Sequence, residues 1–394
     1  MIYLDYAAAT PVSEKVKSEM EPFFSELFFN PSAAYLPAKN VQKLYDDAKG
    51  RIAHTIGAKA PDLVITSGAT EATNLAFTCL PAGKKVLVLS TEHQSVLETA
   101  KNFPHDFIKV DKTGLIDLDD LKSKLDASVG LVSVSLANNE LGTIQPLAKI
   151  AELINLERQN RLKNSDPTPI FFHSDASQAL NLVEINVARL GVDLLTLNAA
   201  KIYGLKGVGA LYVAHGVKLK PITFGGGQEN GLRSGTENVP AVIGFAVAAE
   251  EAKSHLASNR KKYARLKELF LKELAHPLII SHNAKKVKLE PVILGNQKHC
   301  LANFISFSFP GIDAERLIYK LEAQEIYVST GAACAASKGQ KSHVLKAIGL
   351  SAAEISGSLR ISLGATNDEA QVLTAAAAIK SAVQAEAERM MKNV

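Results

Sequence analysis

Polar side chains follow five short apolar runs of the sequence, and many of them are of types that do chemistry. The polar segments are residues 67–74, 90–93, 137–140, 173–178 and 198–201, each after a run rich in Val, Leu, Ile or Phe. In open α/β sheets, ligands bind outside the carboxyl ends of the strands. One polar strand end needs no function, because strand ends require polar caps, but the recurrence predicts that these groups converge on one crevice.

Lys201 and Asp175 are of the residue types that hold a pyridoxal cofactor. A lysine in a dry pocket has a lowered pKa and can form a Schiff base with a carbonyl group. An acid on a neighbouring strand is the partner that a pyridinium nitrogen needs. Each residue also has a plainer interpretation, because most lysines after a strand lie on the surface and Asp175 could cap a helix. The residues by themselves leave both interpretations open.

The residues Gly68, Ala69 and Thr70 suit the binding of a phosphate group. Glycine lets the backbone come close to a ligand, Ala69 and Thr70 offer N–H groups, and Thr70 adds a hydroxyl. The helix expected after them points the positive end of its dipole at the same place. The alternative is that Ser67 or Thr70 only caps that helix.

These groups need a sheet to position them, and the sequence predicts one that is mainly parallel. Apolar runs alternate with longer helical patterns in the first two thirds of the chain, as in a sheet covered by helices on both faces. From about 238 to 275 the pattern is helical and increasingly charged, and strands near 303–309 and 326–329 follow. We expect a large domain of residues 15–255 and a smaller α+β domain of residues 1–14 with 256–394. The strands predicted for the large domain are residues 63–66, 85–89, 130–135, 170–173, 193–197 and 209–213.

The composition is that of a folded globular protein: of 394 residues, 47% are hydrophobic and 21% charged. The formal net charge of +4 is too small to indicate a nucleic acid or an anionic membrane as partner. The N-terminus has no basic start and no signal-type apolar stretch, so we expect the reducing cytoplasm. The three cysteines form no disulfide framework and no Cys-x-x-Cys metal motif. Cys79 is expected in the core, Cys300 has no assigned role, and Cys334 is discussed below.

A series of motifs along nearly the whole chain resembles, in the same order, the NifS/IscS-like cysteine desulfurases. These are enzymes of the class V aminotransferase group that depend on pyridoxal phosphate (PLP). The resemblance implies PLP fold type I, with a mainly parallel seven-stranded sheet in a large domain beside a smaller α+β domain, and a homodimer. The most specific motif is GGGQENGLRSGTEN at residues 225–238. The others are YLDYAAATP (3–11), NPS (30–32), TSGATE (66–71), EH (92–93), NNELG (138–142), DASQ (175–178), KIYG (201–204) and RISLG (360–364).

The resemblance implies a role for each matching residue around the cofactor. Lys201 would hold PLP as a Schiff base, Asp175 would keep the ring nitrogen protonated, and His93 would stack on the ring and move protons. Gln178 would bind the phenolic oxygen of the ring, and Asn139 would support the cofactor and the substrate. The remaining cofactor contacts would come from Gly68, Ala69, Thr70 and Asn198 and, across the homodimer, from Thr236.

The resemblance also implies the substrate and the nucleophile. Arg360 would pair with the carboxylate of L-cysteine through two hydrogen bonds, a geometry that arginine suits. Cys334 lies in a stretch of small residues, 328–342, that is typical of a mobile loop, although an inert buried cysteine is the alternative. The expected reaction removes sulfur from L-cysteine, gives L-alanine and leaves a persulfide on Cys334. The sulfur would then pass to an acceptor protein that serves iron–sulfur cluster assembly or the thiolation of tRNA or a cofactor.

Several positions depart from the family pattern and keep other functions open. Ala200 stands where the family usually has histidine and Asn198 where it often has serine, so one or two phosphate contacts could be missing or replaced. Leu205 and Tyr35 are further departures. One alternative is a selenocysteine lyase or another class V PLP enzyme in which Cys334 is incidental. Another is a protein of the same fold that has lost catalysis and serves as an assembly partner.

Overall fold

The largest sheet of the computed structural model, which describes residues 1–282, 285–330 and 341–392, has seven strands in the order β2-β8-β7-β6-β5-β3-β4. The five strands from β7 to β4 are parallel, and β8 runs antiparallel to both of its neighbours. The mainly parallel seven-stranded sheet expected from the resemblance is confirmed. The strands are β2 Leu63–Thr66, β3 Lys85–Leu89, β4 His105–Ile108, β5 Val129–Ser133, β6 Phe171–Asp175, β7 Leu194–Asn198 and β8 Gly209–Val213.

All six predicted strands of this sheet are present, with ends that differ by no more than about two residues from the prediction. The sequence missed β4, which lies at the edge of the sheet. Three of its four residues, His105, Asp106 and Phe107, are partly or fully exposed. An edge strand of this kind lacks the continuous Val, Leu and Ile run that marks a strand buried on both faces.

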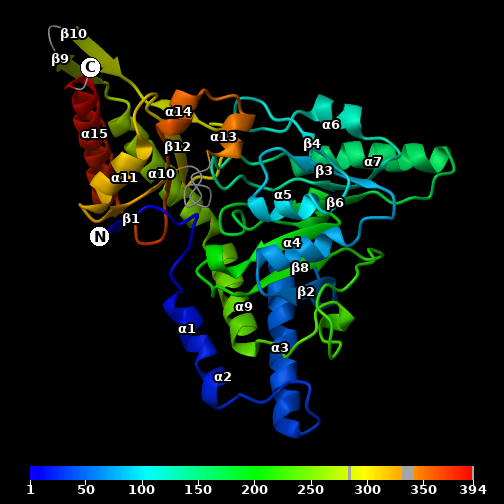
Figure 1. Cartoon of the computed structure of the whole chain (residues 1–394). Coiled ribbons are helices and arrows are strands. Elements are labelled where there is room, and N and C mark those ends of the chain that lie inside the picture. The colour runs from blue at the N-terminus through cyan, green and yellow to red at the C-terminus, as the bar shows by residue number, and fades with distance from the viewer. Residues whose placement is uncertain (283–284, 331–340, 393–394) are drawn as a thin grey trace.

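Helices cover both faces of the sheet because successive side chains of each central strand point to opposite sides. On β3, Val86 and Val88 pack with α4 and α5, whereas Leu87 and Leu89 belong to the core shared with α3, α7 and α9. Figure 1 shows these layers around the central strands. The helices are α4 Ala69–Phe77, α5 Gln94–Ala100, α3 Leu36–Thr55, α7 Leu147–Lys163 and α9 Val239–Ser254.

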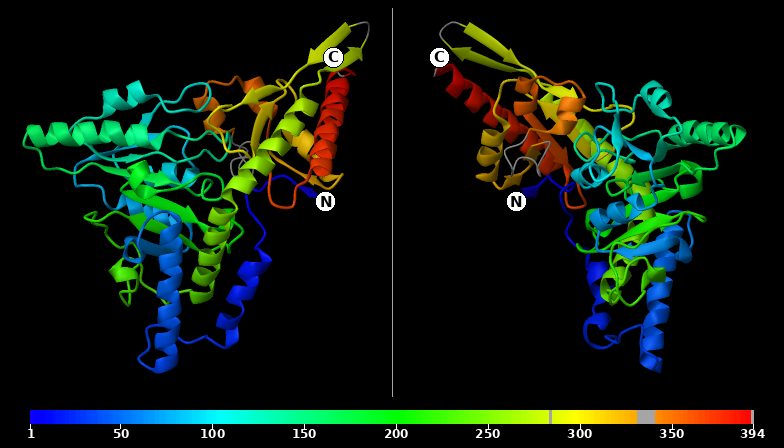
Figure 2. Two further views of the ribbon diagram at one scale, coloured as in Figure 1. Left: turned by 180° about the vertical axis from the view of Figure 1, so that it is seen from behind. Right: turned by 45° about the vertical axis from the view of Figure 1, so that its right-hand side comes forward.

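A second, antiparallel sheet lies to one side of the first, together with long helices and a projecting β-hairpin (Figure 2). Its strand order is β11-β12-β15-β14. The helix α9 ends at Ser254 and α10 begins at Leu256, with His255 between them. The division of the chain into two domains stays a prediction. The elements of this part are β11 Val292–Leu294, β12 Phe304–Ser308, β14 Ser329–Thr330, β15 Ser358–Ser362, the hairpin β9 Leu278–His282 and β10 Lys285–Leu289, and the helices α10 Leu256–Leu274, α11 Ala314–Glu322 and α15 Glu369–Lys392.

The N-terminal segment connects the second sheet to the first. The strand β1 (Ile2–Tyr3) pairs in parallel with β13 (Ile326–Tyr327). The backbone of Leu4 donates to Tyr327 O at 2.9 Å and accepts from Ser362 N at 2.8 Å. The chain then continues into α1 (Glu14–Met20), which packs on α9. Residues 5–8 are therefore fixed at the junction of the two sheets.

Local capping explains where several helices begin. Ser13 accepts from Val16 N at the start of α1, and Asp117 accepts from two backbone N–H groups of α6. Ser351 and Glu354 form a capping box at the start of α14.

In the described part of the chain, no helix is long and apolar enough to cross a membrane. The remaining elements are α2 Pro22–Ser25, α6 Leu118–Lys124, α8 Val187–Leu190, α13 His343–Ala347, α14 Ala352–Ser356 and the 3-10 turns Ala60–Asp62, Ala199–Lys201 and Glu229–Gly231.

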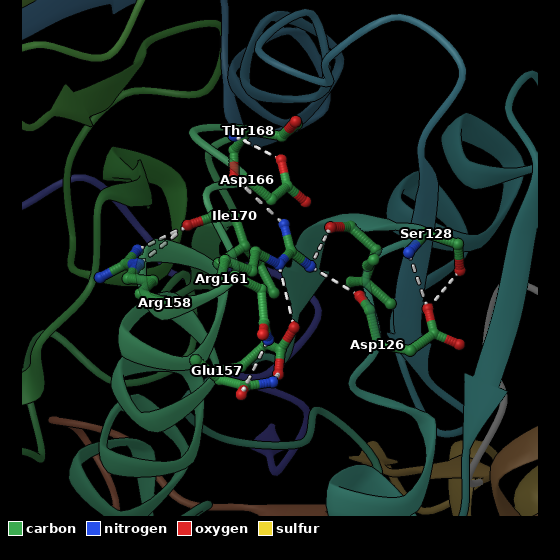
Figure 3. Close-up of polar contacts among 12 residues, drawn as sticks. Asp126, Ser128, Glu157, Arg158, Arg161, Asp166, Thr168 and Ile170 are labelled. Atoms are coloured by element: carbon green, nitrogen blue, oxygen red, sulfur yellow. Dashed lines mark hydrogen bonds and ion pairs between the residues drawn. The ribbon is translucent and has the colours of Figure 1, made fainter.

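Replacing Arg161 with methionine should lower the free energy of unfolding by about 3 kcal/mol. Arg161 lies in the last turn of α7 and is 3% exposed, and Figure 3 shows its polar contacts. Its guanidinium donates to the carbonyls of Asp126 and Val129 and to the carboxylate of Glu157. Methionine keeps much of the volume but removes the hydrogen bonds that the guanidinium donates to these acceptors. Chemical denaturation measures the loss.

The matched control for this prediction is Arg189→Met. The ion pair of Arg189 with Glu184 is exposed, with 76% and 70% of the two side chains accessible. Exposed pairs contribute little, so the change should cost less than about 0.5 kcal/mol. Equal losses in the two variants would contradict the anchoring role of Arg161.

Candidate active site

A cavity of about 390 Å³ lies at the carboxyl ends of the parallel strands, between α4, α5 and β15. We call it the first cavity. The structure brings ten of the predicted site residues together in its walls, from segments that are far apart in the sequence. These are Gly68, Ala69, Thr70, His93, Asn139, Asp175, Gln178, Asn198, Lys201 and Arg360.

Lys201 lies in a 3-10 turn directly after β7 and faces this cavity. Asn198, the last residue of β7, fixes the turn because its Oδ1 accepts from Ala200 N at 3.1 Å. The Lys201 Nζ donates to the carbonyls of Ala7 at 2.8 Å and Ala8 at 2.5 Å. The amine is thus anchored by the N-terminal segment. Asn198, one of the departures from the family pattern, is used to shape the lysine turn.

Asp175 ends β6 and is 7% exposed. Its Oδ1 accepts from the backbone N–H of Ser177 at 2.8 Å and from the Ser177 hydroxyl at 2.6 Å. These two bonds hold the carboxylate in one orientation at the cavity wall. A buried, oriented carboxylate is a suitable partner for a protonated ring nitrogen.

His93 is the N-cap of α5, and its ring lines the cavity. The backbone N–H of Ser95 donates to His93 Nδ1 at 3.1 Å, so the neutral ring carries its proton on Nε2. Burial lowers the pKa of His93; the positive charge of Lys201 lowers it further and Asp175 partly opposes this. His93 is therefore neutral at pH 7, with one N–H that a proton-transfer role can use.

The N-terminus of α4 is built to receive an anion. Its N-cap is Gly68, at φ +144°, and no side chain in the described residues caps the helix. Ser67 N, just outside the helix, already donates to Glu71, and Arg233 balances the charge of that carboxylate at 3.0 Å. The N–H groups of Ala69 and Thr70 at the helix start suit a phosphate. Together with an amine and an oriented carboxylate, this donor set fits PLP.

Arg360 on β15 reaches the cavity from the second sheet and is 3% exposed. Its Nη1 donates to the carbonyl of Asn139 at 2.8 Å, and its Nη2 donates to Asp5 Oδ1 at 2.5 Å. Among the described residues, nothing accepts a hydrogen bond from the buried Nε. A carboxylate is thus already bound at one edge of the guanidinium, a contact that sequence reasoning missed although it had noted the motif that contains Asp5.

The other predicted residues are placed differently. Gln178 Nε2 donates to the carbonyl of Ala7 at 3.0 Å, the same carbonyl that binds Lys201. Thr236 lines a second cavity of about 270 Å³, which shares Ser67 and Gly207 with the first. Cys334 lies outside the described residues.

The remaining two cysteines differ in their surroundings. Cys79 is in the core, as predicted, and burial raises its pKa to about 12. Cys300 is partly buried, and Lys267 Nζ lies 3.4 Å from its sulfur. Burial raises the pKa of Cys300, and Lys267 opposes the rise.

Two buried acids beside the first cavity were quoted in motifs but given no role. Glu140 lines the cavity and accepts from Ser342 Oγ at 2.6 Å. Burial raises its pKa to about 7, although Ser342 and Arg360 oppose the rise. Glu92 is fully buried and accepts from Ser135 N at 2.6 Å, while its Oε2 has no hydrogen-bond partner among the described residues. Only the fold shows that these acids are buried, because the sequence pattern around them is that of exposed loops.

Glu92 should make stability fall as the pH rises. Burial, with the charge of Asp175, raises its pKa from 4.5 to about 8. The folded chain then keeps a proton that the unfolded chain has released, so stability is lost between about pH 4.5 and 8. Glu92→Gln removes this loss. When the pH is raised from 5 to 9, the free energy of unfolding of the variant should therefore fall by about 3 kcal/mol less than that of wild type. Chemical denaturation at both pH values measures it.

The control for the Glu92 prediction is Glu14→Gln, which changes a carboxylate that is 91% exposed. Its pH dependence should stay within about 0.5 kcal/mol of wild type. Parallel stability curves for Glu92→Gln and wild type would show that Glu92 titrates at an ordinary pH.

Comparison with known proteins gives consistent matches. The sequence profile of the aminotransferase class-V family matches residues 2–374. Cysteine desulfurase IscS 1 of Archaeoglobus fulgidus is 39% identical over 382 residues, which is 94% of each chain. Cysteine desulfurase IscS of Dictyoglomus turgidum is 37% identical and covers 92% of this chain and 89% of its own.

Solved structures agree with these sequence matches. A NifS-like protein superposes with a TM-score of 0.84 at 31% identity, covering 96% of this chain and 98% of its own. SspA, solved in complex with cysteine, superposes with a TM-score of 0.75 at 31% identity, covering 92% and 99%. The similarity in sequence and in structure thus extends over nearly the whole length.

Proposed function

The chain belongs to the aminotransferase class-V family and is a cysteine desulfurase, and we propose that it works through PLP held in the first cavity. The observation that carries this proposal is the convergence of the Lys201 amine, the Asp175 carboxylate and the uncapped start of α4 on one cavity. Lys201 would hold the cofactor covalently, Asp175 its ring nitrogen, and residues 68–70 its phosphate. Bound there, PLP supplies an electron sink that stabilises negative charge at the substrate Cα.

The protein's own groups would orient the substrate and move its protons. Arg360 would bind the carboxylate of L-cysteine at the cavity wall formed by β15. The ring of His93, neutral at pH 7, would release the proton on Nε2 as it takes up another on Nδ1, where the Ser95 hydroxyl lies at 2.8 Å. Lys201 would exchange protons at the substrate Cα through Nζ. Gln178 and Asn139, which line the same cavity, would fix the cofactor's oxygen.

Cys334 would carry out the sulfur transfer. Its thiolate attacks the sulfur of the substrate and forms a sulfur–sulfur bond. The carbon–sulfur bond breaks with its electron pair moving to the carbon, which is then protonated, and L-alanine leaves. The persulfide on Cys334 would pass its outer sulfur to an acceptor protein with a thiol. Thr236, in the second cavity, would serve the partner subunit's cofactor in a homodimer.

The proposal is tested by adding L-cysteine to the purified holoenzyme and measuring alanine and protein persulfide together. We expect equal amounts of the two in a single turnover. Cys334→Ser should form neither at more than about 1% of the wild-type rate, since the hydroxyl cannot accept sulfur. Cys300→Ser is the matched control and should keep wild-type rates. Alanine formation that survives in Cys334→Ser would favour a lyase in which this thiol is incidental.

A further inference from the structure

A Ser-His pair at the start of α13 contacts two of the turns that line the first cavity. Ser342 Oγ donates to Glu140 Oε2, directly after Asn139 in the chain. His343 lines the cavity itself and contacts the turn that carries His93. The pair thus ties one helix of the second part of the chain to two separate turns of the large sheet.

The ring of His343 binds the residues on both sides of His93. Its Nε2 lies 2.9 Å from the carbonyl oxygen of Glu92, and because a carbonyl only accepts, Nε2 is the donor. The other nitrogen of the neutral ring, Nδ1, is then an acceptor, and the amide of Gln94 donates to it at 3.3 Å. Both ring nitrogens are therefore engaged with the turn around His93.

The helix that carries His343 is held in place by its N-cap and by apolar packing. Ser342 caps α13, since its Oγ accepts from Leu345 N at 3.1 Å. Val344, Leu345 and Ile348 pack against Leu141, the neighbour of Glu140, in a small apolar cluster. Burial lowers the pKa of His343, so the ring is neutral at pH 7 and keeps its donor and acceptor in place.

His93 depends on the turn that His343 holds. His93 is the N-cap of α5, and the backbone N–H of Ser95 donates a hydrogen bond to its Nδ1. We infer that His343 is a positioning residue for His93: by binding the carbonyl of Glu92 and the amide of Gln94, it fixes the turn that points the His93 ring into the cavity. Its effect on turnover rests on the proposed function, whereas its effect on the His93 ring does not.

Two substitutions at position 343 separate the hydrogen bonds from the bulk of the ring. His343→Phe keeps a flat ring but removes the donor and the acceptor, and His343→Gln keeps one of each. The holoenzyme, labelled with ¹⁵N-histidine, reports the His93 tautomer by NMR, with His93→Gln identifying the signal. In wild type we expect one tautomer, protonated on Nε2. His276→Phe, at an exposed histidine between α10 and β9, is the control for both readouts.

We expect His343→Phe to give a mixture of His93 tautomers and to lower kcat with L-cysteine about tenfold, with KM within about twofold. His343→Gln should keep the single tautomer and stay within about threefold of wild-type kcat. Gln94→Met, which removes only the weaker of the two bonds, should shift the His93 signal in the same direction but less. Thermal unfolding checks that each variant is folded.

An unchanged His93 signal in folded His343→Phe would overturn the inference, as would equal damage by Phe and Gln at this position. A changed His93 signal with wild-type turnover would support the positioning role and would count against the proposed proton transfer by His93. The failure of the inference and the failure of the proposed function can therefore be told apart.

Discussion

Replacing Lys201 with alanine is expected to abolish the desulfurase reaction, with a loss of kcat of at least about 10⁴-fold. Its Nζ is held at the cavity wall by the carbonyls of Ala7 and Ala8, and its aliphatic chain comes from the turn after β7. Alanine removes both the covalent attachment and the proton carrier. Alanine production from L-cysteine measures the loss.

A second readout tests the attachment itself. Reduction with borohydride should fix the cofactor to the wild-type chain, so that mass spectrometry finds it on the peptide with Lys201, and should leave the variant unmodified. Lys206→Ala, at an exposed lysine of the same loop, is the matched control and should behave as wild type. Cofactor fixed to any other lysine, or turnover retained in Lys201→Ala, would contradict the assignment.

Replacing Asp175 with asparagine should lower kcat about 10³-fold, which corresponds to ~4 kcal/mol in the transition state. The two side chains have the same shape, so the bonds from Ser177 can persist, but the negative charge beside the ring nitrogen is lost. Without that charge the ring nitrogen loses its proton at neutral pH, and the electron sink weakens. The rate of alanine formation at saturating L-cysteine measures this effect.

Ser177→Ala is the companion to the Asp175 prediction. It removes the hydroxyl that orients Asp175 and keeps the charge, so the expected loss is about tenfold or less. The difference between the two variants isolates the contribution of charge from that of orientation. A wild-type rate in Asp175→Asn, with the cofactor still bound, would show that this carboxylate does not face the ring nitrogen.

The sequence was informative where burial is complete. The runs around Val86–Leu89 and Leu194–Leu197 are buried on both faces, so their composition alone marked them as central strands. The carboxyl ends of the strands in this sheet carry most of the site, so nine of the ten predicted residues in the first cavity come from there, and Arg360 comes from the second sheet. The edge strand β4 was not predicted because most of its residues are partly or fully exposed to solvent.

The contacts that the sequence did not reveal join positions that are far apart in the chain. The ion pair of Asp5 with Arg360 depends on how the second sheet lies against the first. The same is true of the hydrogen bond between His343 and the turn around His93. No local pattern encodes that placement. The buried state of Glu92 is a further case, because a glutamate after a strand is usually solvated.

The path of the N-terminal segment also bears on how the protein matures during synthesis. Residues 2–8 are synthesised long before their partners Tyr327, Arg360 and Ser362. Domains usually fold in the order in which they emerge, so the large sheet can form while Lys201 still lacks its carbonyl partners. A nascent chain should therefore remain catalytically incompetent until Ser362 has been translated, and a chaperone that bound residues 1–10 would delay activation without delaying folding of the central sheet.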